Sequence, residues 1–151
     1  MHKTIEKTSM KKLLFLFLFC IVISCSSKLK TTESKPLFEI LTTQEEGGAS
    51  IRFFEILSEE KEIKMLQNDD LLQNKINSND TKTCNFIILN MGEKTTLGYT
   101  IGVKKVEETT SKIIITTQDN EPKTKQNVEK EVFYYPYTIL KINSKKEIVI
   151  Q

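Results

Sequence analysis

The most prominent feature of the hydrophobic pattern is an unbroken apolar run near the N-terminus. Lys11 and Lys12 precede the eleven residues from Leu13 to Ile23, all of them apolar. A transmembrane helix needs about 20 such residues to cross the hydrocarbon core of a bilayer. The run is too short for that, and its basic flank is typical of a cleaved secretory signal peptide.

The end of this run predicts lipid attachment. Val22-Ile23-Ser24-Cys25 resembles a bacterial lipobox, whose cysteine receives diacylglycerol and palmitate and begins the mature protein. We expect residues 1–24 to be a lipoprotein signal peptide, with translation starting at either Met1 or Met10. An ordinary signal peptide with an incidental cysteine is the alternative, but no A-x-A cleavage site is present. More than one acyl chain would hold the mature protein stably at a membrane.

A polar segment separates this cysteine from the first strand-like pattern. Residues 25–36 are rich in serine, threonine and lysine, lack apolar periodicity and end at Pro36. They are expected to form a flexible tether. Residues 37–151 then form one β-rich domain.

The first part of this domain predicts two strands, over 37–41 and 50–57. The turn Glu45-Glu46-Gly47-Gly48 lies between them, since paired glycines tolerate positive φ. The two strands are candidates for a hairpin with a long loop.

A helical segment follows the second strand. Ser58 is a candidate N-cap, and Glu59 and Glu60 suit the positive end of a helix dipole. The segment 68–70 interrupts the helical pattern, so one kinked helix and two short helices are both compatible with it. The polar run 77–83 is expected to be a loop. The apolar positions of the helical stripe are Ile63, Met65, Leu66, Leu72 and Ile76.

The remaining sequence has the pattern of strands. The segment 85–91 is apolar at both alternating sets of positions, as in a central strand, and Pro136 predicts a bulge or a sheet edge within 128–142. The domain is expected to be mainly β (α+β). It would form either a single antiparallel sheet or a sandwich. The other expected strands are 99–104, 112–118 and 145–151, with 119–127 a polar loop.

The charge distribution bears on whether the protein binds nucleic acid. The 22 basic and 20 acidic residues of the full chain become 18 and 19 once four lysines and one glutamate leave with the leader. No basic block remains that could track phosphates, so nucleic acid is not an expected partner.

The chemistry-bearing residues are few. The only histidine is His2, in the leader, which excludes histidine-dependent catalysis and histidine zinc sites in the mature chain. Cys84 is the single cysteine left after processing and lipidation, and it is expected to be a buried small side chain. We expect no catalytic residues, no metal and no cofactor, and therefore no enzyme.

Two segments carry a family resemblance. The residues from Gly92 to Val103, GEKTTLGYTIGV, are similar to a strand–turn–strand unit of the PrcB C-terminal domain, with its Gly-Gly-Tyr turn. The residues from Tyr135 to Ile142, YPYTILKI, are similar to its Tyr-Pro-Tyr strand, and Pro122 lies where the family often has a proline. The resemblance covers about Phe86 to Ile142. Leu97 departs from the family pattern, because it replaces the first glycine of the turn.

The resemblance implies a lipoprotein that assists or stabilises a surface protease complex without catalysis of its own. An exposed loop beside aromatic residues would form the binding surface, although a turn and a sheet core explain the same residues. The candidate partner-binding residues are Thr95, Thr96, Gly98, Tyr99, Tyr135 and Tyr137.

Two other functions stay open at this point. The residues from Thr95 to Tyr99 are also faintly similar to a Thr-Thr-Gly-Tyr loop of chagasin-type protease inhibitors. A small-molecule-binding envelope module is the third alternative. The expected location is the cell envelope, with lipid attachment to the periplasmic side of an outer membrane.

Overall fold

The computed structural model describes residues 35–123 and 132–151. The leader, Cys25 and most of the expected tether lie outside the described residues. The elements are β1 (Phe38–Gln44), β2 (Phe53–Leu57), α2 (Glu60–Gln67), α3 (Asp80–Thr83), β3 (Asn85–Asn90), β4 (Thr100–Glu108), β5 (Lys112–Asn120), β6 (Tyr137–Ile142) and β7 (Glu147–Ile150).

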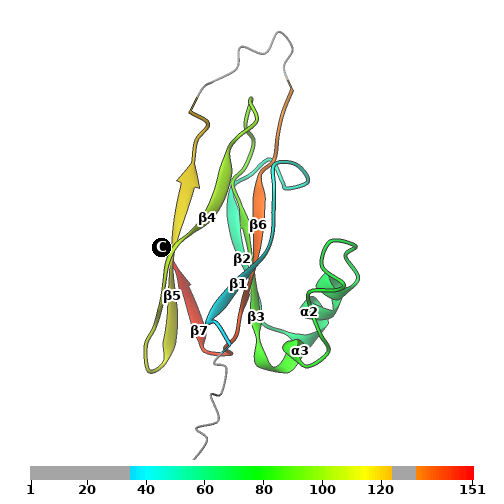
Figure 1. Ribbon diagram of the computed structural model, residues 1–151, viewed down its shortest axis with the longest axis vertical. Helices are drawn as coiled ribbons and strands as arrows, with labels where there is room; N and C mark the ends of the chain where they lie inside the picture. Colours follow the sequence, from blue (N-terminus) through cyan, green and yellow to red (C-terminus); the bar gives the residue numbers. More distant parts are fainter. Residues whose placement is uncertain (1–34, 124–131) are drawn as a thin grey trace, which may run out of the picture. The chain divides into compact units, whose positions relative to one another are not determined.

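The strands form two sheets, which confirms the mainly β class (Figure 1). The four-stranded sheet has the order β1-β6-β3-β2 and is antiparallel throughout. The three-stranded sheet has the order β4-β5-β7, and β7 runs parallel to β5. The prediction of purely antiparallel pairing was therefore wrong for the last strand.

The apolar residues between the two sheets form the main core. Alternate residues of a strand point to opposite faces, so one set from each strand enters this layer. The fully or nearly fully buried members are Ile87, Leu89, Met91, Ile101, Ile113, Ile115, Leu140, Ile142 and Ile148. Of the two arrangements left open by the sequence, the structure is therefore the sandwich.

The helical segment covers the opposite face of the four-stranded sheet (Figure 1). Phe86 of β3 and Ile139 of β6 are buried there against Ile63, Leu72 and Ile76. The strand β3 thus packs on both faces, as its continuous apolar pattern predicts, and it lies between β6 and β2.

The connection between β1 and β2 is not a hairpin. β6 and β3 lie between them in the sheet, so the predicted pairing was wrong. Tertiary packing of the two central strands decides the order, and the long segment 45–52 crosses the end of the sheet instead.

The helical segment differs from its prediction at both ends. Glu59, not Ser58, is the N-cap residue of α2, and the Glu62 carboxylate accepts hydrogen bonds from both backbone N–H groups, at 3.0 and 3.1 Å. After α2 the chain continues through turns, so neither expected form of the helical stripe was right. The segment expected to be a loop over 77–83 contains α3, whose buried Asp80 accepts the N–H of Asn77 at 3.1 Å.

The expected strand over 128–142 is shorter than predicted. Residues 128–131 lie outside the described part, and β6 begins only after Pro136. Because β6 is central, the expected sheet edge or bulge at Pro136 was wrong. A proline is tolerated directly before a strand, where its missing N–H interrupts no ladder. β5 in turn extends through Asp119 and Asn120, which the sequence had assigned to a loop.

Candidate functional site

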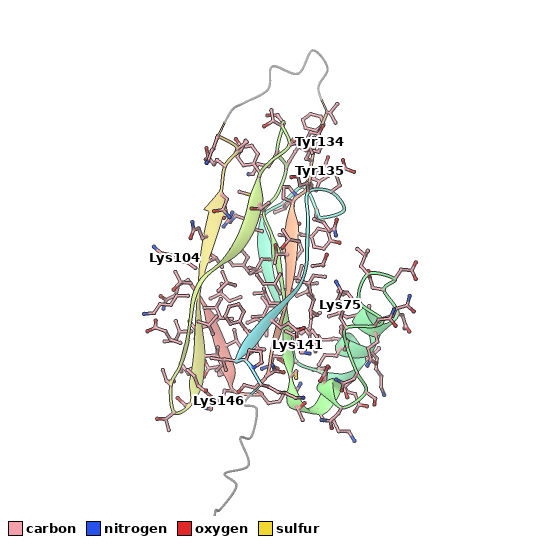
Figure 2. All side chains as sticks on the ribbon, in the orientation of Figure 1. Lys75, Lys104, Tyr134, Tyr135, Lys141 and Lys146 are labelled. Carbon is pink, nitrogen blue, oxygen red and sulfur yellow. The ribbon has the colours of Figure 1, made fainter. Side chains whose placement is uncertain are left out.

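The register of β6 with its neighbouring strands shows which loops lie at which end of the sheet. Its first residue, Tyr137, lies opposite Gln44 and Asn90, and its last residue, Ile142, lies opposite Phe38. The segments 45–52, 91–99 and 132–136 therefore gather at one end, which we call the distal end. The chain enters at the other end, where the backbone N–H of Asn143 donates to the carbonyl of Leu37 at 2.9 Å. Figure 2 shows Tyr134 and Tyr135 far from Lys146, which marks the entry end.

A short backbone bridge positions the candidate turn. The N–H of Lys94 donates to the carbonyl of Tyr134 at 2.9 Å, and the N–H of Tyr134 returns the bond at 2.8 Å. The Lys94 ammonium also lies 5.6 Å from the ring centroid of Tyr99, within cation–π range. The turn and the aromatic segment thus form one surface, although they are about forty positions apart in the sequence.

The turn itself depends on a single glycine. Gly98 has φ +91°, and a Cβ at this position would come within 2.8 Å of Cβ of Pro122. Leu97 does not have positive φ, because no non-glycine residue of the described part does. The leucine that replaces a family glycine is therefore unstrained, and its side chain is 47% exposed at the tip of the turn.

The loop 45–52 is held against this surface by Asn90. The buried Asn90 amide donates to the carbonyls of Ala49 and Ile51 at 2.8 and 2.6 Å and accepts the N–H of Ala49 at 2.9 Å. The N–H of Gly48 donates to the carbonyl of Tyr135 at 2.9 Å. These bonds satisfy the polar groups of the loop and fix its backbone.

The distal end exposes several large apolar side chains beside half-buried tyrosines. Leu97, Val132 and Phe133 are exposed, while Tyr99 and Tyr135 are half-buried. Large apolar side chains grouped on a surface and joined by tyrosines are typical of protein-binding sites.

Five of the six candidate binding residues come together at this end. They are Thr95, Thr96, Gly98, Tyr99 and Tyr135. Tyr137 does not join them, because its ring packs against the helix-side core and the Gly47 turn. Burial raises the pKa of the Tyr137 hydroxyl, and the charge of Asp69 raises it further.

Sequence reasoning missed the exposed Leu97 and Phe133. The signal for Leu97 was present, since a large apolar residue replaced a glycine in a surface turn. Phe133 lies outside the two segments that carry the family resemblance, and β6 begins only four residues later.

No group of three histidine, cysteine or acidic side chains is placed to hold a metal within 35–123 and 132–151. Burial raises the pKa of the Cys84 thiol, which donates to the Asn143 side-chain oxygen at 3.4 Å. This thiol lines a polar pocket of about 350 Å³ at the entry end, with Lys35, Asn79 and Glu108. In the same residue ranges, no helix has the length and apolar character needed to cross a membrane.

Residues 85–143 match the model of the family described as PrcB C-terminal. This part of the chain is similar to the PrcB C-terminal domain. The comparison with curated proteins gave no match, and neither did the comparison with solved structures. The matched segment confirms the resemblance of Phe86 to Ile142, and it runs from β3 through the Thr95–Tyr99 turn to the end of β6. Most of the distal end therefore lies within the segment that is similar to the PrcB C-terminal domain, whereas the loop 45–52, β2 and the helices precede that segment.

Proposed function

We propose that this protein is a lipid-anchored, non-catalytic accessory that binds a partner in an envelope protease complex through its distal end. The observation that carries the proposal is the grouping of Leu97, Phe133, Tyr99 and Tyr135 at the end opposite the chain entry. A tether attached at Lys35 would leave that end free to meet a partner. The PrcB C-terminal match supports the association with a protease complex.

Co-purification tests this function. The tagged full-length protein, extracted from membranes in mild detergent, is expected to bring down the same secreted protease or protease subunit in repeated experiments. Leu97→Ser is expected to reduce that recovery at least about tenfold, a loss of about 1.4 kcal/mol that fits one apolar contact. Met65→Ser is the matched control, since Met65 is a 68% exposed apolar side chain on α2. Recovery that is equal for both variants contradicts the proposed surface.

A second candidate function is inhibition of a papain-like protease. It is favoured by one observation, the exposed Thr95–Tyr99 turn at the end of a two-sheet sandwich. Titration of papain with the purified protein tests it, and inhibition at micromolar concentration is the expected result. Unchanged protease activity in the presence of a large excess of the protein excludes this function.

A further inference from the structure

The strand β2 exposes an unusual amount of apolar surface. Phe53, Phe54 and Ile56 are each more than one third exposed, and Ile51, just before the strand, is 74% exposed. Phe54 and Ile56 point to the face opposite Phe53, because neighbouring residues of a strand alternate. Both faces of β2 therefore present large apolar side chains.

β2 is also an open sheet edge. In the described part of the chain it pairs with β3 alone, so its outer backbone groups have no strand beside them. Such an edge is a template for another strand unless charges, bulges or short length protect it. β2 contains no bulge, no lysine and no proline.

The other three edges have this protection. β1 has a bulge between Ile40 and Thr42, where the Lys75 ammonium binds the carbonyl of Leu41 at 2.5 Å. β4 has a bulge next to the exposed Lys104 (Figure 2). β7 is only four residues long. β2 is only one residue longer than β7 and carries the charge of Glu55, but it exposes three large apolar side chains, which makes it the edge best suited to accept a strand.

The residue directly before β2, Arg52, connects this edge to the other sheet. The Arg52 guanidinium binds the Asp119 carboxylate through two hydrogen bonds of 2.7 and 3.0 Å, which joins β2 to the end of β5. The same guanidinium lies 5.2 Å from the centroid of the Phe54 ring. A preorganised edge loses less conformational entropy when a strand is added.

We propose that β2 binds an extended segment of the partner protein as a fifth strand of its sheet, with a basic residue beside Glu55. This inference rests on the proposed function as a protein-binding accessory and names how the partner is held. Backbone hydrogen bonds would supply affinity, and the apolar side chains on both faces would supply contact area.

The charge of Glu55 determines which kind of partner strand can pair with β2. Glu55 is exposed at the centre of β2 and has no ion-pair partner among the described residues, while Arg52 is neutralised by Asp119. Pairing of β2 with β2 of a second copy in full register would place Glu55 directly opposite Glu55. Like charges in this position destabilise a strand pair, whereas an opposite charge stabilises it. A partner strand with lysine or arginine at this position is therefore favoured over a second copy.

Synthetic peptides test the edge directly with the full-length protein in detergent. The probe is a short peptide of alternating threonine and valine with a central lysine, and a matched peptide carries glutamate instead. The lysine peptide is expected to bind and to protect the amides of 53–57 from hydrogen exchange. A third peptide has alternate backbone nitrogens methylated, which keeps its side chains but removes donors, and it is expected to bind at least about tenfold more weakly.

The variant Glu55→Lys gives the matched control. Because Glu55 is exposed, the fold should tolerate the change, and the preference between the two peptides should reverse. Absent binding of the lysine peptide, equal binding of the methylated peptide or an unreversed preference would each overturn the inference. So would self-association of the wild-type protein that masks the amides of 53–57. The proposed function is judged separately, because its co-purification test depends on Leu97 and not on the β2 edge.

Discussion

At the scale of single residues, Lys141 has the clearest structural role, because it forms ion pairs with two carboxylates. It lies on the helix side of β6, where its ammonium reaches the Glu39 carboxylate at 3.0 Å and the buried Asp80 carboxylate at 3.5 Å (Figure 2). Burial disfavours the charged form, but the hydrogen bond that the ammonium donates to Glu39 and the charge of Asp80 outweigh this effect, and the pKa of Lys141 is raised. The ammonium thus ties α3 to the sheet.

Removing this ammonium should destabilise the fold. Lys141→Met leaves Asp80 buried without its cation, so a loss of about 3 kcal/mol in the free energy of unfolding is expected from urea titration. Glu39→Gln, at a half-exposed position, is the control and should cost less than about 1 kcal/mol. Since a raised lysine pKa stabilises below the unfolded value of about 10.4, the contribution should be constant at neutral pH and disappear only above that value. Equal losses for the two variants would contradict the assignment.

Cys84 offers a second test at this scale. Burial raises its pKa and keeps the thiol protonated, so alkylation by iodoacetamide at neutral pH should be at least about tenfold slower in the native protein than in urea. A thiol whose pKa is raised by folding also lowers stability as the pH rises through its unfolded value of about 8.5. Native alkylation as fast as in urea would show that this side chain is not buried.

At the scale of elements, two glycines near the start of β4 can be compared. Gly98 has a positive φ that other residues rarely adopt, whereas Gly102 does not. Gly98→Ala is expected to cost about 1–2 kcal/mol from positive φ, with a further cost from contact with Pro122. Gly102→Ala in β4 meets no atom within 4 Å and should change the free energy of unfolding by less than about 1 kcal/mol. Thermal unfolding of both variants measures the difference, and equal melting temperatures would disprove the assigned role of Gly98.

Elements whose local pattern agrees with their packing could be predicted from the sequence. The continuous apolar run of β3 marked a central strand because both faces of that strand are covered. The signals of Gly98 and Tyr99 likewise placed a turn before β4, because positive φ there suits only glycine.

Elements that depend on distant partners could not be predicted. The parallel pairing of β7 with β5 and the separation of β1 from β2 depend on which strands pack at the centre, and no local signal encodes this. The short helix α3 could not be predicted either, because it also depends on a distant partner. Its polar sequence suggests a loop, and Asp80 becomes favourable only through Lys141, which lies 61 positions later in the chain.

Part of the candidate site could also be predicted from the sequence. The turn residues and Tyr135 were found through the family resemblance. Tyr137 was assigned to the wrong surface because the strand begins after Pro136, which turns its side chain to the helix-side core. Leu97 and Phe133 contribute apolar area that only the three-dimensional grouping reveals.

At the scale of the whole molecule, the two ends of the described unit differ in the residues they carry, and we propose different functions for them. The entry end receives the segment that follows Cys25, and the distal end carries the exposed aromatic and apolar residues. An anchored protein of this kind would present its binding residues away from the membrane.

The anchor is testable separately from the partner. Cys25→Ala should abolish incorporation of labelled palmitate and move the protein out of the membrane fraction, because Cys25 is the proposed site of lipid attachment. Cys20→Ala, which changes a cysteine within the leader, should leave both unchanged. Membrane retention and labelling in Cys25→Ala would contradict the lipoprotein assignment.

The most direct test of the central claim is site-specific photo-crosslinking in intact cells. A photoreactive amino acid at Leu97 is expected to give one discrete adduct that contains a secreted protease or a subunit of its complex. The same amino acid at Met65, which is on α2 and is more exposed than Leu97 (68% against 47%), should give no such adduct. Adducts of equal yield at both positions, or none at Leu97, would show that the distal end is not the binding surface.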